Sequence, residues 1–288
     1  MTDTNIDYIL EPAIYMIVTF IMFVIGKYIY QLFHPKINVK NELVIEDNLA
    51  FAIAHTGYFV GLLIAIGSAI VGPSHGLIID LIDIVVYGSL AIILLNISTI
   101  INDKLILYKF DVRKEIIEDK NEGTGAIEGA SAIAAGLIIY GSVSGETDYL
   151  AFGVFTSVAF WLIGQAIMIL TAWVYNLITS FDVHEQIEKD NVAVGVGFAG
   201  AIIAIANLIR FSLMGDFIDW TSSLTKIAAY VIIGFVFLII TRFIADKVLL
   251  PGQKLTDELI NQEKPNVGAG IIEAFAYIGG SILITWSL

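Results

Sequence analysis

Ionisable side chains recur at a fixed place inside the most apolar parts of the sequence. Glu128 and Glu273 each follow an asparagine by seven residues, and His55 holds the corresponding position in an earlier segment. In a helix that rises about 1.5 Å per residue, this places them about 10 Å beyond the helix start. A carboxylate at that depth in a membrane is costly and commonly marks an ion or proton site. The alternative is a structural hydrogen bond from each glutamate to an asparagine or lysine of a linker, near the cytoplasmic interface.

Four asparagines set the spacing of these groups, and the intervals between them are 73, 70 and 75 residues; they are Asn48, Asn121, Asn191 and Asn266. An internal period of this length indicates a repeated supersecondary unit. Asparagine before an apolar helix is favoured as an N-cap, and the other reading is that these residues line a cytoplasmic entrance. Phe198 stands seven residues after Asn191, so the repeats do not predict a complete ring of polar groups.

The composition indicates that these repeats lie in a membrane. The chain has 288 residues, 57% hydrophobic and 15% charged, whereas soluble domains are about 25% charged. Apolar runs long enough to cross about 30 Å of hydrocarbon recur along it, without the alternation of a β-barrel. We predict an all-α polytopic membrane protein with eight spans, near 10–33, 48–71, 77–103, 123–142, 149–179, 191–211, 222–250 and 267–286.

Lysine and arginine predict the orientation of these spans. Of the 15 basic residues, 13 lie on or beside the connections that follow the odd-numbered spans, and basic residues concentrate on the cytoplasmic side. We therefore expect cytoplasmic linkers, both termini outside the cytoplasm and a bacterial inner-membrane location. The N-terminus lacks the basic region of a secretory signal, so we expect the first helix to be retained. The net charge of −13, without a basic patch, does not favour nucleic acid.

Each repeat reads as a long inward helix, a linker and a short outward helix. Asp111 and Asp182 have the positions of N-caps, which predicts short amphipathic linker helices on the membrane surface. Because two spans per repeat preserve direction, the four helix hairpins of about 73 residues are parallel repeats. The first and third linkers resemble the second and fourth less than fully, so we divide the chain into two four-helix membrane domains, 1–145 and 146–288.

Polar residues also occur within the long helices. Asn96, Gln165 and Arg242 precede the next repeat's asparagine by 25, 26 and 24 residues, which suggests an equivalent depth. Hydrogen bonding between helices is the common role of such residues. A shared polar pathway is the second interpretation.

The chain resembles a known family in these same features. The tandem four-helix halves and the segments EDNLAFAIAHTGYFVG and EKDNVAVGVGFAGAIIA are similar to bacterial inner-membrane proteins of the YjfL type, known as a domain of unknown function (number 350). The resemblance covers nearly the whole chain. It implies an inner-membrane location, four helices per domain and no established activity, and it supplies no catalytic residue.

Two classes of function fit the sequence. The first is a channel or transporter for an ion or small solute, with Glu128, Glu273 and His55 as its site. The second is a non-transporting scaffold, for instance in envelope stress, which forms homo-oligomers through Gly and Ala faces and offers its linkers to a cytoplasmic partner. An enzyme is not expected, since the sequence has no cysteine and no recognisable nucleophile, metal-ligand or cofactor motif.

Overall fold

The computed structural model describes residues 7–145, 149–250 and 252–287, and these residues form an all-helical bundle of four similar hairpins. Each hairpin begins with a long helix; these are α1 (Asp7–Phe33), α3 (Leu77–Leu105), α6 (Leu150–Ile178) and α9 (Trp220–Ile244). Each ends with a short helix; these are α2 (Leu49–Gly67), α5 (Glu122–Val143), α8 (Val192–Leu213) and α11 (Val267–Ser287). The four hairpin repeats predicted from the asparagine spacing are therefore confirmed.

The described part of the chain contains eight helices that are long and apolar enough to cross a membrane. They coincide with the predicted spans to within a few residues at each end. The largest difference is in the second span, which ends at Gly67, because the following residues form the turn into α3. Many large apolar side chains on the outer surface of the bundle are exposed, as a surface in contact with lipid requires.

Short helical turns connect the long and short helices at one end of the bundle; they are η1 (Asn41–Ile45, π-helical), α4 (Val112–Ile117), α7 (Val183–Glu188), and the π-helical η2 (Ala245–Leu249) followed by α10 (Leu255–Ile260). The side chain of Asp111 accepts the amide hydrogen of Lys114 at 3.0 Å, and that of Asp182 accepts from His184 at 3.0 Å. Both capped linker helices predicted from the sequence are confirmed.

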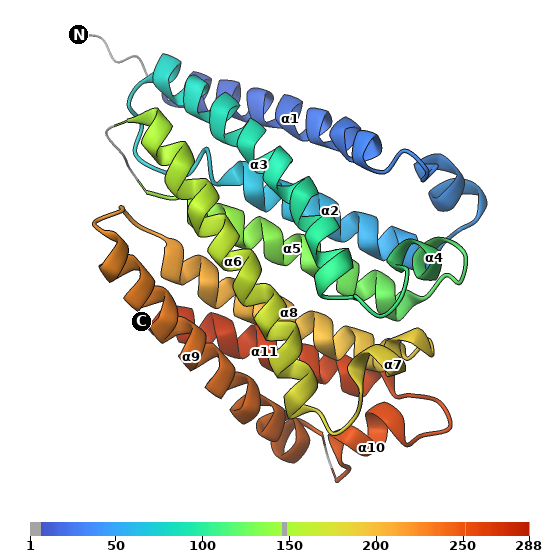
Figure 1. Ribbon diagram of the computed structural model, residues 1–288. Helices are drawn as coiled ribbons and strands as arrows, with labels where there is room; N and C mark the ends of the chain where they lie inside the picture. Colours follow the sequence, from blue (N-terminus) through green and yellow to red (C-terminus); the bar gives the residue numbers. More distant parts are fainter. Residues whose placement is uncertain (1–6, 146–148, 251, 288) are drawn as a thin grey trace.

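The helices lie in two layers (Figure 1). The short helices form one layer in chain order, so that α5 packs between α2 and α8, and α8 packs between α5 and α11. The long helices cross one face of this layer. All four linkers lie at one end of the bundle, whereas α1 begins and α11 ends at the other (Figure 1).

Glycine allows the short helices to approach closely. Gly125 lies against the backbone of Ala50, Gly195 against that of Gly123, and Gly270 against that of Ala193. A β-carbon added at any of these three glycines would collide with the neighbouring backbone. Small residues are the usual means by which membrane helices achieve such contact, so the glycines hold the layer together.

Candidate functional site

The four asparagines cap the short helices, as the favoured interpretation predicted. In each repeat the side-chain oxygen accepts the amide hydrogen of the residue three positions later; the N···O distances are 3.0 Å at Asn48, 2.9 Å at Asn121, 3.1 Å at Asn191 and 3.2 Å at Asn266. This satisfies one of the amide hydrogens that a helix start leaves without a partner.

Three of these asparagines also bind the next repeat. The side-chain nitrogen of Asn48 donates to the carbonyl of Ile116 at 2.8 Å, and that of Asn121 donates to Ile187 at 2.7 Å; the third bond runs from Asn191 to Leu259 at 2.9 Å. The same nitrogens donate to a linker side chain of their own repeat, which is Glu42, Glu115 or Gln186. The asparagines therefore fasten adjacent repeats to one another.

The residue seven positions after each asparagine contacts a side chain from the long helix of its own repeat. The four pairs are Tyr30 with His55, Asp103 with Glu128, Tyr175 with Phe198, and Arg242 with Glu273. The first and third pairs are ring contacts, with centroids 4.7 and 4.9 Å apart. The second and fourth pairs contain Glu128 and Glu273, so each half of the chain has one pair with a glutamate. The Asp103–Glu128 pair of the first half is called the acidic pair below.

In the second half, the glutamate is paired with a basic side chain. Glu273 is fully buried and forms an ion pair with Arg242, whose side chain is 13% exposed. Glu273 Oε1, the oxygen that Arg242 contacts, also accepts hydrogen bonds from the hydroxyls of Tyr175 at 3.3 Å and Tyr277 at 3.2 Å. Glu273 Oε2 and Arg242 Nη2 are buried without a hydrogen-bond partner. A buried charge is tolerated when it has a partner of opposite charge, and here the chain itself supplies that partner.

In the first half, no basic side chain of the described residues forms an ion pair with Asp103 or Glu128. The carboxyl groups of Asp103 and Glu128 lie next to each other. An ionised carboxylate can only accept hydrogen bonds, so a hydrogen bond between the two requires one proton. Asp103 Oδ1 and Glu128 Oε2 are buried without a hydrogen-bond partner. Both side chains nevertheless remain partly accessible, unlike Glu273.

The charged and titratable neighbours do not neutralise this pair. Tyr30 and His34 approach it from α1 and the following turn, and Asp111 and the exposed Lys104 lie near Asp103. Burial lowers the pKa of the His34 side chain below its usual 6.5, so His34 is neutral at pH 7. The described ionisable neighbours of the pair therefore add no buried positive charge.

His55 is surrounded by rings. Its imidazole stacks on Phe51 with centroids 5.1 Å apart and packs against Phe59 at 4.3 Å and Tyr30 at 4.7 Å. The residue is buried, and its Nδ1 has no hydrogen-bond partner. The repeat alignment placed His55 with the two glutamates, and the structure gives it an aromatic setting instead of an acidic partner.

The three polar residues of the long helices have separate environments. Asn96 donates to the hydroxyl of Tyr58 at 3.1 Å and to the carbonyl of Ile92 at 2.8 Å. Gln165 is buried, and neither atom of its amide has a partner. Within the described residues, Arg242 is the member of this set that contacts a predicted carboxylate.

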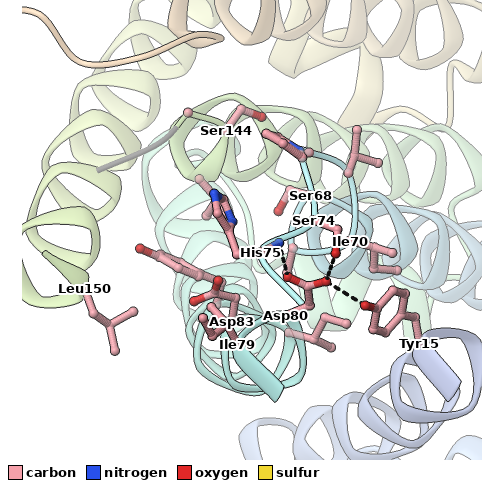
Figure 2. A pocket seen from close by; sticks show the side chains of 18 of the residues that line it. Tyr15, Ser68, Ile70, Ser74, His75, Ile79, Asp80, Asp83, Ser144 and Leu150 are labelled. Carbon is pink, nitrogen blue, oxygen red and sulfur yellow. Dashed lines mark hydrogen bonds between the residues drawn. The ribbon is translucent and has the colours of Figure 1, made fainter. Parts of the chain in front are cut away.

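A cavity of about 540 Å³ opens at the end of the bundle opposite the linkers. Figure 2 shows Asp80 at its wall, where the carboxylate accepts from Tyr15 Oη at 2.6 Å, Ser74 Oγ at 2.5 Å and the amide of His75 at 2.9 Å. These bonds tie the loop after α2 to α1 and α3. The sequence did not reveal this cavity, because its wall comes from loops whose apolar and polar residues follow no period.

Sequence reasoning also missed the long-helix partners Tyr30, Asp103 and Tyr175. A signal was present, since Tyr30 precedes His55 by 25 residues and Asp103 precedes Glu128 by the same interval. Comparing the repeats for a second constant interval would have found both pairs.

The eight apolar helices and their arrangement in four similar hairpins define a polytopic helical membrane protein built from tandem units. The family described as Domain of Unknown Function (DUF350) matches residues 5–143 and again 149–288. The chain belongs to this family and contains two copies of its domain, which confirms the family resemblance seen in the sequence.

Curated relatives agree with this assignment. A UPF0719 transmembrane protein of Aquifex aeolicus (strain VF5) is 26% identical over 209 residues, which cover 71% of this chain and 76% of the relative. The UPF0719 transmembrane protein YshE of Bacillus subtilis (strain 168) is 29% identical over 126 residues, which cover 44% of this chain and 87% of the relative. No solved structure is significantly similar to the chain.

Proposed function

We propose that this protein binds protons or small cations at the Asp103–Glu128 pair and moves them across the membrane. One observation carries the proposal: two carboxyl groups lie next to each other within the bundle, and among the described residues neither forms an ion pair with a basic side chain. Two adjacent negative charges in a low-dielectric setting repel strongly, so a positive charge must accompany them. Part of each side chain is accessible at the surface of the bundle, and we infer that the charge exchanges there.

The second half supports this interpretation by contrast. Arg242 occupies the place next to Glu273 that Asp103 occupies next to Glu128. A permanent guanidinium there supplies the positive charge that the first half must take from solution. The two halves therefore have different roles, the first in ion exchange and the second in structure.

We further propose that the linkers face the cytoplasm, that both termini lie outside it and that the membrane is the bacterial inner membrane. The distribution of lysine and arginine supports this orientation. A proton or cation would then reach Glu128 from the linker end, because this residue lies in the second turn of α5, next to the linker α4.

The test is ion flux in proteoliposomes with H⁺, Na⁺ or K⁺ gradients. We expect flux in the wild type and its loss in Glu128→Gln and in Asp103→Asn, with the protein still folded. Glu122→Gln is the matched control, because Glu122 lies in the first turn of the same helix and outside the pair, and it should conduct as the wild type does. Absence of flux in correctly inserted wild type for all three ions would refute the proposal.

A second candidate is a membrane scaffold without transport, with homo-oligomers and a cytoplasmic protein partner at the linkers. It is favoured by the observation that neither Glu128 nor Glu273 lines the cavities of about 540 and 440 Å³. The carboxylates would then serve only helix packing. Under this function the Asp103→Asn variant would retain the full activity of the protein, whatever its partner, and liposomes would remain impermeable to all three ions.

A further inference from the structure

The layer of short helices is open at both ends. In the first three repeats the capping asparagine is buried and donates to a carbonyl of the following repeat. Asn266 caps the fourth repeat, and among the described residues its side chain makes no hydrogen bond to another repeat. Its side chain is exposed, and its amide donates to Glu258 of its own linker at 2.7 Å. One of its two amide hydrogens is therefore left for an acceptor outside the chain.

The first repeat presents the complementary half of this contact. The carbonyl that receives each crossing bond belongs to the apolar residue directly after the linker side chain that binds the asparagine; the dipeptides are Glu115-Ile116, Gln186-Ile187 and Glu258-Leu259. Glu42 binds Asn48 in the first repeat, so Leu43 is the equivalent acceptor. The apolar side chains of the other three linkers are buried, whereas Leu43 is 39% exposed and is followed by the exposed Val44 and Ile45.

The helices next to these linkers have matching free positions. Inside the layer, each contact at this level joins a residue two positions after one asparagine to a residue four positions after the next; the pairs are Ala50–Gly125, Gly123–Gly195 and Ala193–Gly270, each with at least one glycine. The unused positions are Gly268 on α11, which is exposed, and Ala52 on α2. Together they form a fourth pair of the same type.

About one to two helical turns farther from the linkers, the outward-facing side chains of α2 and α11 are larger than those at the contacts inside the layer. The internal pairs there are small, as Gly57 with Gly129 and Gly200 with Ala274 show. The free edges carry Thr56 on α2 and Phe275 on α11, both exposed. Two helices with these side chains touch near the linkers and diverge toward the other end of the bundle.

We propose that copies of this chain associate head to tail, with α11 of one copy against α2 and η1 of the next. The argument is continuity, since three contacts of one kind follow each other in the layer and both halves of a fourth lie free at its ends. Such a contact uses two different surfaces, so it gives closed rings or open rows of copies. In it, Asn266 donates to the Leu43 carbonyl of the neighbouring copy.

The length of a relative supports this continuity. The aligned part of the Bacillus subtilis protein is 126 residues and 87% of its length, which is close to the length of one of the two family matches in this chain. The contact between α5 and α8 joins the two matched ranges. In this chain, therefore, one unit-to-unit contact is already made inside the polypeptide, and the proposed contact repeats it between polypeptides.

Disulfide cross-linking in isolated membranes tests the proposal, because the chain has no cysteine of its own. The variant carries both Ala52→Cys and Gly268→Cys. A β-carbon at Gly268 meets no backbone atom and comes within 3.1 Å of Asn266 Oδ1, so that side chain must shift by a few tenths of an ångström to accommodate it. On oxidation we expect a ladder of dimers, trimers and larger species. The register control carries Leu63→Cys with Gly268→Cys, since Leu63 is exposed on α2 at the diverging end, and it should give no ladder.

Single-cysteine variants separate the alternatives. Each single variant should remain monomeric on oxidation, and Asn266→Ala added to the double variant should reduce the ladder several-fold. Dimers formed by Gly268→Cys alone would show a symmetric α11 contact and overturn the proposal. Monomers alone from the double variant, with both thiols accessible to a maleimide, would show that lipid covers these edges and would also overturn it. The cross-linking result does not depend on whether the protein conducts ions.

Discussion

The ion pair between Arg242 and Glu273 makes a quantitative prediction about stability. Replacing Arg242 by methionine keeps much of the side-chain volume and removes the charge, which leaves the fully buried Glu273 without its counter-ion. Removing one partner of a buried pair costs about 3–5 kcal/mol. Because the hydroxyls of Tyr175 and Tyr277 still donate to Glu273, we expect a loss near the lower limit, about 3 kcal/mol. This lowers the ratio of folded to unfolded protein by roughly two powers of ten.

The assay is reversible unfolding in mixed micelles, with the free energy of unfolding extrapolated to the absence of denaturant. Arg242→Met combined with Glu273→Gln should recover most of the loss, since glutamine accepts both tyrosine hydrogen bonds without a charge and replacement of a whole buried pair is often neutral. Asp103→Asn is the control from the first half. It removes one of two like groups, so it should cost less than about 1 kcal/mol. The reasoning is refuted if Arg242→Met is as stable as the wild type, or if the double variant is no more stable than the single one.

Three further predictions concern the linkers and the helix layer. Asn121→Ala should cost more unfolding free energy than Asn266→Ala, which loses a cap of about 1 kcal/mol but no bond to a following repeat; chemical unfolding compares them. Gly195→Leu should abolish folding, seen as aggregation during detergent extraction, because its side chain meets the α5 backbone. The hydrogen bond from Lys109 lowers the pKa of Asp182 below 3.8, so its contribution exists above that pH and disappears as the carboxylate is protonated; Asp182→Asn should therefore destabilise at pH 7 and match the wild type in acid.

The fold was largely predictable from the sequence, because a membrane leaves few choices. Backbone polar groups must be satisfied within each span, so apolar runs of sufficient length become helices. The asparagine period then groups these helices into hairpins. The short linker helices were also predictable, because Asp111 and Asp182 occupy N-cap positions and cap these helices in the structure. The packing order of the short helices was harder to predict, since the pattern of glycines shows that helices pack closely but does not show which helices are neighbours.

The partners within the site were harder to predict, because they depend on how far each long helix continues before the chain turns. Arg242 was aligned with Asn96 and Gln165 by counting back from the next asparagine. In the structure it contacts the position-seven residue, as Asp103 and Tyr175 do. The cause is local, since the π-helical turn η2 and the linker before α10 lengthen the last repeat, so Arg242 precedes its partner by 31 residues instead of 25.

The crossing bonds of the asparagines impose an order on biosynthesis. The side-chain amide of each asparagine bonds a backbone carbonyl that is synthesised 66–68 residues later. At about 5–20 residues per second, this interval takes roughly 3–14 s of translation. A hairpin that has just entered the membrane therefore remains incompletely fastened until the next one arrives. The bundle grows in one direction, and each newly made linker completes the cap region of its predecessor.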